Sequence, residues 1–496
     1  MMITGGARLG RALALIPAAL TLLTGCAVGP NYVRPTVIVP DAYKEADGWK
    51  PARPRDDTDR GAWWEIFADP QLSALEARVS VSNQNLVVAE AQFRQARALV
   101  REARANFFPQ VTVGVGVSRS RPSSSVPAGS GASSGAQSNY TLPLDVSWGL
   151  DVWGRIRRMV ESNQAGAQAS AADLETARLS IQTELMLDYF QLRTLDAQKQ
   201  LLTATAAAYQ QSLELTENRY ASGVASRADV LQAQTQLKST QAQAIDVGVQ
   251  RAQLEHAVAL LVGEPPSSFS LAAAPLTTLP PSIPFGLPSE LLERRPDVAA
   301  AERRVASANA QIGVAVAAFY PTVTLSASAG FESSTPAKWL VWPSRFWSAG
   351  PNVSESVFDG GLRSALTDQA RAAYDASVAA YRQAVLTAFQ NVEDNLAALR
   401  ILEDEARIQD EAVKAAQQAV ILTTNQYKAG IVSYLNVITV QTIALTDEVT
   451  AIQIRGRRMA AAALLVQALG GGWTAAELPS PTDVTKREDP APRPGG

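Results

Sequence analysis

The sequence of 496 residues predicts an α+β membrane protein that is internally duplicated, with four β-strands and long α-helices in each chain. Three observations lead to this fold class. Two stretches about two hundred residues apart repeat each other, long segments space their apolar residues by three, four and seven, and shorter segments alternate apolar with small polar residues. The first two indicate paired helical hairpins, and the third indicates strands.

The repeated stretches are NRYASGVASRADVLQAQ, which begins at Asn218, and NQYKAGIVSYLNVITVQ, which begins at Asn425. Each lies between two long helical patterns. A glycine can close the first helix in the left-handed conformation, and the serine that follows can cap the next. Each stretch therefore predicts the tip of an antiparallel hairpin, over 218–230 and 425–437. The predicted turn residues are Gly223, Ser226, Gly430 and Ser433.

Composition excludes several classes of protein. Acidic and basic residues nearly balance, with a net charge of −3, so no basic surface for nucleic acid is expected. One cysteine cannot form an internal disulfide, and one histidine leaves little for a metal site or a catalytic triad. No nucleophile elbow, phosphate loop or metal-ligand spacing is present. We expect no enzyme activity, cofactor or metal.

The N-terminus has the pattern of a lipoprotein signal. Arg8 and Arg11 precede an apolar run, residues 12–23, that is too short to span a bilayer as a helix, so residues 1–25 are expected to be a signal peptide. The run ends in Leu-Thr-Gly-Cys, which resembles the lipobox of bacterial lipoproteins. That resemblance implies cleavage before Cys26 and acylation of its sulfur and amine. No aspartate follows Cys26, which favours the outer membrane.

The rest of the chain divides into an arm, two repeats and a tail. Residues 26–70 are rich in proline and are expected to lie over the body as an extended arm, anchored by Trp63 and Trp64. In each repeat, a helix ends at a proline, Pro109 or Pro321, because the residue before proline disfavours the helical conformation. The predicted first repeat is 71–287, with a helix over 71–107, strands over 111–118 and 139–150, and a Pro-rich connector. The predicted second repeat is 288–472, with strands over 322–331 and 348–358, and a flexible tail follows over 473–496.

Four strands cannot span a bilayer alone, because both edges of the sheet would expose unpaired backbone groups to hydrocarbon. Three chains give a closed barrel of about twelve strands, within the range of membrane barrels. Valines follow Pro109 on one face of the first strand, and small residues occupy the other face, as an open pore requires. The long helices would then continue this trimeric barrel as a hollow periplasmic tube.

The order of elements, the FFP and FYP turns, the stretch LPSELLERRPDVAAAERR at 287–304 and the two tips resemble the outer-membrane efflux duct family, the TolC-like group in its NodT-type lipoprotein branch. The resemblance covers the chain from Cys26 to about Gly472. It implies a homotrimer in the cell outer membrane, a twelve-stranded β-barrel and a periplasmic α-helical barrel. It also implies partnership with a periplasmic membrane-fusion adaptor and an inner-membrane transporter of the resistance-nodulation-division (RND) type, and passive export of small molecules.

The tips depart from the family at one point. Much of the family carries two aspartates after the second tip glycine, where this chain has Asn436 and Thr439. The first tip has Asp229. This residue has two open interpretations: a gate residue bonded to Arg227, Arg219 or Lys428, or part of a capping box with Ser226. The candidate gate residues also include Tyr220 and Tyr427.

Two other functions remain open on the sequence. An exit duct for type I protein secretion would have the same architecture. The sequence cannot separate the two cargoes, because a wide polar duct need not recognise its substrate. A periplasmic adaptor or scaffold lipoprotein would also carry a signal, a lipid and a helical hairpin. An adaptor predicts one hairpin and soluble β-domains, however, and the duplication and the valine-faced strands argue against it.

Overall fold

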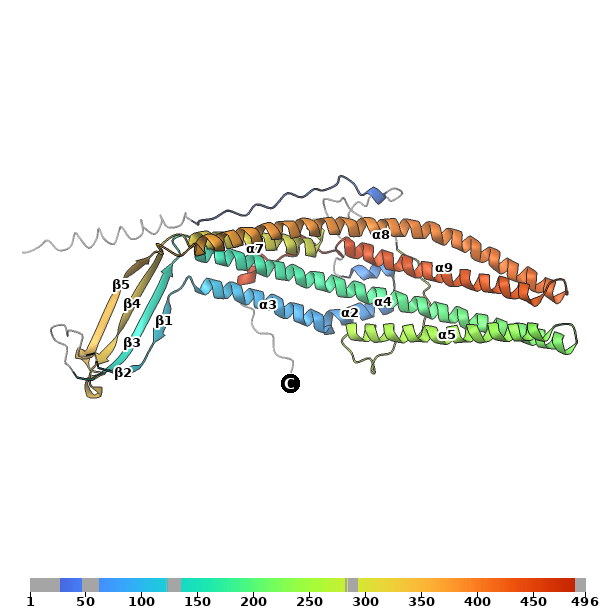
Figure 1. Ribbon diagram of the computed structural model, residues 1–496, viewed down its shortest axis with the longest axis horizontal. Coiled ribbons are helices and arrows are strands. Elements are labelled where there is room, and N and C mark those ends of the chain that lie inside the picture. Colours follow the sequence, from blue (N-terminus) through green and yellow to red (C-terminus); the bar gives the residue numbers. More distant parts are fainter. Residues whose placement is uncertain are drawn as a thin grey trace, which may run out of the picture.

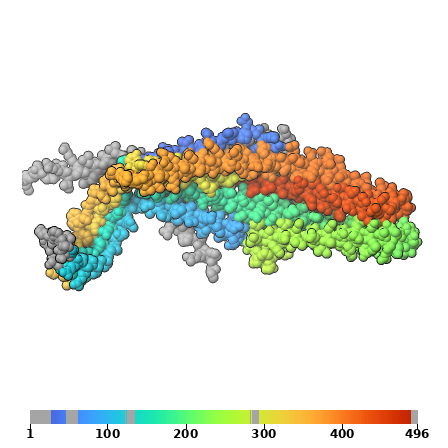
Figure 2. Space-filling view, in the orientation of Figure 1, coloured from blue at the N-terminus to red at the C-terminus, as the bar shows by residue number. Residues whose placement is uncertain are grey.

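The computed structural model describes residues 27–46, 62–121, 123, 135–281, 283 and 293–486. The predicted signal peptide and Cys26 lie outside these ranges. The molecule is elongated, with a β-sheet at one end and two helical tips at the other (Figure 1). The space-filling view shows the sheet as a narrow extension inclined to the helical body (Figure 2). Among the described residues, we find no helix with the length and apolarity needed to cross a membrane.

Two helices of 67 residues run along the body, and at about 1.5 Å per residue each is roughly 100 Å long. A shorter helix returns from each tip, and another shorter helix lies nearer the sheet. The bounds are α4 Arg155–Ala221, α8 Leu362–Lys428, α5 Arg227–Leu261, α9 Tyr434–Ala468, α3 Gln84–Ala105 and α7 Pro296–Ala317. One long helix, α4, packs against all four of the shorter ones, and the other, α8, packs against α7 and α9.

The single helix expected over 71–107 is wrong: the structure has α2, Pro70–Ser82, and then α3. Asn83 between them is extended, and its Oδ1 accepts hydrogen bonds from the backbone N–H groups of Asn85 and Leu86 at 2.9 and 3.2 Å. The asparagine caps a new helix instead of continuing the old one. The apolar spacing alone does not show this break.

The break belongs to a joint that occurs once in each repeat. The Asn83 amide donates to the Leu261 carbonyl at 2.8 Å, so α3 begins where α5 ends. The Arg295 guanidinium donates to the Ala468 carbonyl at 3.1 Å, so α7 begins where α9 ends. Asn83 and Arg295 are equivalent positions of the repeats, and so are Leu261 and Ala468. Each pair of short helices thus forms one interrupted column beside a long helix (Figure 1).

The joints depend on glycine, and this gives a test. Gly470 follows α9 with φ 94°, and a Cβ there would collide with the Arg294 carbonyl oxygen. Because a left-handed residue with a Cβ costs about 1–2 kcal/mol before any clash, Gly470→Ala should lower the free energy of unfolding by at least that amount. The control is Gly248→Ala in α5, where a Cβ meets open space. That change should stabilise the helix by about 0.5–1 kcal/mol. Thermal unfolding of the two variants should shift in opposite directions, and equal shifts would contradict the joint.

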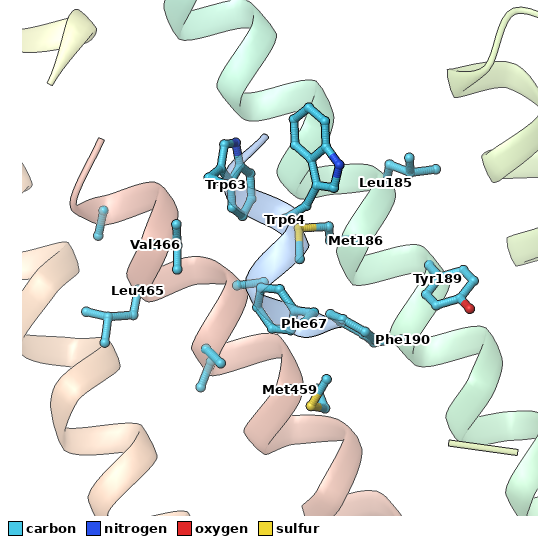
Figure 3. Packing of buried hydrophobic residues seen from close by; sticks show 14 of the residues in the cluster. Trp63, Trp64, Phe67, Leu185, Met186, Tyr189, Phe190, Met459, Leu465 and Val466 are labelled. Atoms are coloured by element: carbon cyan, nitrogen blue, oxygen red, sulfur yellow. The ribbon is translucent and has the colours of Figure 1, made fainter. Parts of the chain in front are cut away.

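The core lies at mid-length, around the 3-10 helix η2, Trp63–Phe67 (Figure 3). Trp63 and Trp64 are buried, as the sequence suggests, and the Trp63 indole donates to the Gln182 side chain at 3.2 Å. The Phe67 ring lies 5.2 Å from that of Phe190. Side chains of α4 and α9 enclose this segment, among them Leu185, Met186, Tyr189, Phe190, Met459, Leu465 and Val466.

One acidic side chain is buried in α2. Glu76 is 0% exposed, and neither carboxylate oxygen has a hydrogen-bond partner among the described residues. Burial raises its pKa to about 9, because a charged carboxylate loses its hydration there. At neutral pH the Glu76 side chain is therefore protonated in the folded protein.

The connector after α5 is held by a buried ion-pair network. The Asp196 carboxylate accepts from Arg193 at 3.1 Å, from Arg251 at 2.7 Å and from the backbone N–H of Ala274 at 3.0 Å. The two arginines also donate to the carbonyls of Ala272 and Leu271, at 2.7 and 2.6 Å. This cluster pairs the buried carboxylate with two arginines and gives the backbone of the connector hydrogen-bond partners.

The described part of the N-terminal arm lies along the outside of the body (Figure 1). Arg158 of α4 donates to the carbonyls of Val28 and Gly29, both at 3.2 Å, and to the Asn31 side chain at 2.9 Å. A Cβ on Gly29 would come within 2.5 Å of the Gly313 Cα in α7, so only glycine fits at this crossing. The arm therefore starts at the end of α4 that adjoins the sheet.

The flexible tail expected over 473–496 is corrected for its first part. Trp473 and Val484 are buried against the helices. The Arg97 side chain donates to the Lys486 carbonyl at 2.7 Å, and Gln168 donates to that of Pro479 at 2.9 Å. Two apolar anchors and these hydrogen bonds hold a segment whose proline content suggested disorder. Residues 487–496 lie outside the described ranges.

The sheet is antiparallel, in the order β1/β2, β3, β4, β5. The expected first strand is split at Gly114 and Val115, although the register is continuous. Pro143 of β3 stands opposite and has no N–H to donate, so the ladder is interrupted there. The fourth strand begins and ends earlier than expected, and Val357 and Phe358 are exposed beyond it. The bounds are β1 Gln110–Val113, β2 Gly116–Ser120, β3 Gln137–Leu150, β4 Thr322–Ser333 and β5 Arg345–Ser354.

Candidate functional site

The two faces of the sheet differ in chemistry. Directly opposed residues of antiparallel strands point to the same side, so the register assigns each residue to a face. Leu144 stands opposite Val113 and Ala329, and Val146 stands opposite Val111 and Ala327. We call this side the apolar face. It continues through Val117, Tyr140, Leu142, Trp148, Leu150, Val323, Leu325, Phe331, Trp347 and Val353.

The opposite side, which we call the polar face, carries small residues. Ser147 stands opposite Gln110 and Ser326, and Gly149 stands opposite Thr324. No strand residue of the described sheet is buried on either face. A sheet that is apolar on one side, small and polar on the other, and uncovered on both does not resemble a sheet packed on a soluble core. The remaining small residues of the polar face are Thr112, Gly116, Ser118, Thr141, Ser328, Gly330, Ser348 and Gly350.

Helix and sheet meet at two prolines. Pro109 lies between the end of α3 and β1, and Pro321 lies between the end of α7 and β4. The Trp153 indole donates to the Pro321 carbonyl at 2.8 Å and stacks on Tyr320 at 4.8 Å. The Trp148 indole donates to the carbonyl of Phe107 at 2.9 Å. These tryptophans satisfy the carbonyls at the junctions where the helices end.

The first tip contains the capping box. The Ser226 hydroxyl accepts from the Asp229 backbone N–H at 3.1 Å, and the Asp229 carboxylate accepts from the Ser226 N–H at 2.9 Å. Gly223 has φ 74°, in the left-handed region that glycine favours. Within the described residues, no ion pair joins Asp229 to Arg227, Arg219 or Lys428. Of the two interpretations of Asp229, the capping geometry is present, and the gate role remains a proposal.

The second tip has the same turn without the box. Gly430 has φ 78°, and Ser433 precedes α9 without a side-chain cap. Its hydroxyl lies 3.4 Å from the Asn436 Oδ1. The Thr439 hydroxyl donates to the Leu435 carbonyl of its own helix at 2.9 Å. The residues that replace the expected aspartates are therefore engaged locally.

The two tips are joined through one arginine. The Arg219 guanidinium at the end of α4 lies 4.8 Å from the ring centre of Tyr427 and donates to the Lys428 carbonyl at 3.0 Å. Tyr427 is buried, while Tyr220, its equivalent in the first repeat, is 43% exposed. Three of the candidate gate residues, Arg219, Tyr427 and Lys428, thus meet in one contact between the hairpins.

An aromatic cluster under this contact escaped the sequence analysis. The Tyr434 ring lies 5.3 Å from that of Tyr427, and burial raises the pKa of Tyr434 to about 12. The Tyr209 hydroxyl donates to the Gln441 carbonyl at 3.2 Å, linking α4 to α9. Tyr434 and Tyr209 were not identified from the sequence as site residues. Both lie on helical faces next to the repeated tips, and this position in the sequence could have indicated their role.

A groove runs between α5 and α9 behind the tips. It has a volume of about 500 Å³ and is lined by polar side chains with a few aliphatic ones. Leu231, Gln232 and Thr235 come from α5, and Leu435 and Ile438 come from α9. The aliphatic side chains on its walls, Leu231, Leu435 and Ile438, are of the kind against which the apolar face of another helix packs.

The described residues contain no cluster of three or more histidine, cysteine, aspartate or glutamate side chains that could hold a metal ion. The lipidation candidate Cys26 lies outside the described ranges. Ala27, the next residue, contacts Gly154 at the junction of β3 and α4, close enough that a Cβ on Gly154 would come within 2.7 Å of the Ala27 Cα.

Comparisons with known proteins agree on one family. The model of the outer membrane efflux protein family matches residues 76–264 and 287–471. The chain is 31% identical over 466 residues to the pyoverdine export outer membrane protein OpmQ of Pseudomonas aeruginosa, covering 93% of this chain and 97% of OpmQ. It is 33% identical over 471 residues to the solvent efflux pump outer membrane protein SrpC of Pseudomonas putida, covering 92% and 98%.

Solved structures give the same result. The outer-membrane channel OprN has a TM-score of 0.83 and 30% identity, covering 90% of this chain and 100% of OprN. The open state of the Neisseria gonorrhoeae MtrE outer membrane channel has a TM-score of 0.79 and 28% identity, covering 91% and 99%. The mixed, mostly helical fold, the duplicated hairpins and the two-faced sheet are thus those of a transport duct and not of an enzyme. The chain belongs to the outer membrane efflux protein family.

Proposed function

We propose that this protein is the outer-membrane exit duct of a tripartite efflux pump and conducts small molecules passively as a homotrimer. The observation that carries the proposal is the sheet with one apolar and one small polar face and with two open edges, β1/β2 and β5. Three copies joined edge to edge would close about twelve strands around a lumen. The apolar face would contact lipid, and the polar face would line the pore.

The helices support the same assembly. Ile401 and Ile408 of α8 are exposed and seven residues apart, and Leu422 follows at the same spacing two repeats later. Ile245 and Val249 of α5 are exposed four residues apart, on one face of that helix. An unpaired apolar stripe with a period of seven is a coiled-coil seam without its partner. A neighbouring copy would bury these stripes and complete a periplasmic tube.

The two ends of the tube would meet different partners, proteins at the helical tips and lipid near the sheet. The groove between α5 and α9 fits a helix of a periplasmic adaptor, which would connect the duct to an inner-membrane transporter of the RND type. The relatives are named for export of pyoverdine and of solvents, which favours small-molecule efflux over type I protein secretion. At the other end, acylation of Cys26 would place the lipid beside the junction of helices and sheet, at the membrane surface.

The gate is proposed at the contact between the tips. Arg219 links the two hairpins of a chain, and three-fold symmetry would place three such contacts around one axis. A cation–π contact at an exposed site contributes about 0.5–1 kcal/mol, and three together bias the closed state. We therefore expect Arg219→Ala to raise the open fraction by about tenfold or more. Asp229 would support the gate by fixing the start of α5.

The test is single-channel recording in planar bilayers. Arg219→Ala should raise mean conductance while detergent-resistant trimers persist. The control is Lys238→Ala in α5, a cation whose hydrogen bond among the described residues is to Gln241 of its own helix, and this variant should conduct like the wild type. Wild-type protein that forms neither trimers nor channels would overturn the duct. If the Arg219→Ala variant conducted like the wild type, the gate would not be at the contact between the tips.

A further inference from the structure

We propose that the end of the sheet farthest from the helices binds phosphorylated lipid headgroups of the surrounding leaflet. The binding surface, which we call the distal rim, consists of Arg119, Arg121, Lys338, Arg345 and the tryptophans of the loop between β4 and β5. This inference rests on the proposed function, because the apolar face of the sheet must lie in lipid.

Basic residues outnumber acidic residues at this end of the sheet. From Arg119 to Ser138 and from Glu332 to Arg345 the sequence contains four basic residues and one acidic residue. The chain as a whole has a net charge of −3, so this concentration of positive charge is local. The segment 122–134, whose sequence has no charged residue, adds nothing to compensate it.

The strand register separates the acid from the bases. Arg345 stands opposite Phe331, and Arg119 belongs to the same side as Val117, so both arginines lie on the apolar face. Glu332 is opposite Thr141, on the polar face, and accepts a hydrogen bond from Asn139 at 2.8 Å. The acid of this end therefore points toward the lumen, and the cations point toward lipid.

The cations of the rim are exposed, and in the described part of the chain none of them forms an ion pair. The Arg345 guanidinium carbon lies 3.1 Å from the ring centre of Trp342, and its Nε donates to the Trp342 carbonyl at 2.9 Å. These contacts fix the guanidinium beside an exposed indole and leave its two terminal nitrogens available. A fixed guanidinium matches the geometry of phosphate oxygens.

The aromatic residues place this cluster at the membrane interface. Trp342 and Trp347 are 72% and 80% exposed, and Trp339 packs on Tyr140 with ring centres 5.8 Å apart. Tryptophan and tyrosine collect at the headgroup level of membrane proteins, and long basic side chains extend from there toward polar headgroups. Cations at that level, without acids of their own, are complementary to anionic headgroups. In an outer membrane the outer leaflet supplies these as phosphorylated glycolipid.

The experiment measures lipid retained by the full-length trimer. Protein is reconstituted in nanodiscs of phosphatidylcholine mixed with lipid A, re-extracted in mild detergent, and weighed by native mass spectrometry. Each basic side chain near an anionic surface changes affinity by about fivefold. We therefore expect the double variant Lys338→Gln, Arg345→Gln to lose lipid A retention by roughly twenty-fold. Inorganic phosphate should compete only weakly, because the acyl chains add to binding by the intact lipid.

Two controls make the result specific. Glu332→Gln, on the polar face, should retain lipid A like the wild type, as should Lys238→Gln in α5, far from the sheet. The proposed rim site would be wrong if the double variant retained as much lipid A as the wild type. It would also be wrong if the wild type retained dephosphorylated lipid A as well as lipid A. Conductance in phosphatidylcholine alone separates the two proposals. A wild-type channel that conducts but retains no lipid A refutes the rim only, and one that neither assembles nor conducts refutes the duct.

Discussion

Replacing Asp196 with alanine should lower the free energy of unfolding by about 3–5 kcal/mol, the range for removing one partner of a buried ion pair. The side chains of Arg193 and Asp196 are only 3% and 2% exposed, and that of Arg251 is 15% exposed. Without the carboxylate, Arg193 stays out of water with no ion-pair partner, and Arg251 keeps only the carboxylate of Glu255 at 3.0 Å. The backbone N–H of Ala274 also loses its acceptor, so the connector should detach.

Thermal unfolding in detergent, followed by circular dichroism of the helices, measures the loss of stability. Limited proteolysis within the connector measures its detachment. The matched control is Asp404→Ala in α8, which breaks an ion pair with Arg407 whose side chains are 70% and 64% exposed. Exposed pairs contribute about 0–1 kcal/mol, so this variant should melt near the wild type. If both variants melted alike, the Asp196 network would be only a surface pair.

Glu76→Leu should stabilise the protein, and the gain should grow with pH. Burial raises the folded-state pKa of Glu76 from an ordinary value near 4.5 to about 9. Between these values the folded state holds a proton that the unfolded state releases, so wild-type stability falls as the pH rises and levels off above about 9. At about 1.4 kcal/mol for each pH unit, the cost at pH 8 is roughly 3–5 kcal/mol.

Denaturant unfolding of wild type and variant across pH 5 to 9, both values within the window set by the shift of Glu76, measures this difference. The two stability curves should converge toward acid pH and separate toward alkaline pH. Glu90→Leu, at an exposed position of α3, should run parallel to the wild type at every pH. Parallel curves for Glu76→Leu would show that its carboxyl group finds a partner or water in solution.

Much of this fold can be predicted from the sequence, because its periodic patterns are long and occur twice. The alternation after Pro109 and Pro321 places the strands, and the repeated glycine and serine place both tips. Local competition limits the prediction. The side chain of Asn83 caps a new helix inside an apolar spacing that continues through it, and Pro143 interrupts a ladder on the neighbouring strand.

Contacts between distant segments limit the prediction of the candidate site. The sequence identifies Arg219, Tyr427 and Lys428 as gate candidates because they adjoin the tips, but it does not show that Arg219 reaches from one hairpin to the other. Tyr434 and Tyr209 have the spacing of ordinary core residues. The order of the tail likewise depends on where Trp473 and Val484 meet the helices, and composition carries no information about that.

The joints between α5 and α3 and between α9 and α7 have a mechanical consequence. Each chain contains two uninterrupted rods and two rods that are divided at mid-length. A continuous helix transmits a displacement of its tip to its far end, whereas a division bridged by a few hydrogen bonds absorbs part of it. A displacement of α5 or α9 at the tips would therefore be absorbed at the level of Asn83 and Arg295, whereas a displacement of α4 or α8 would reach the strand end.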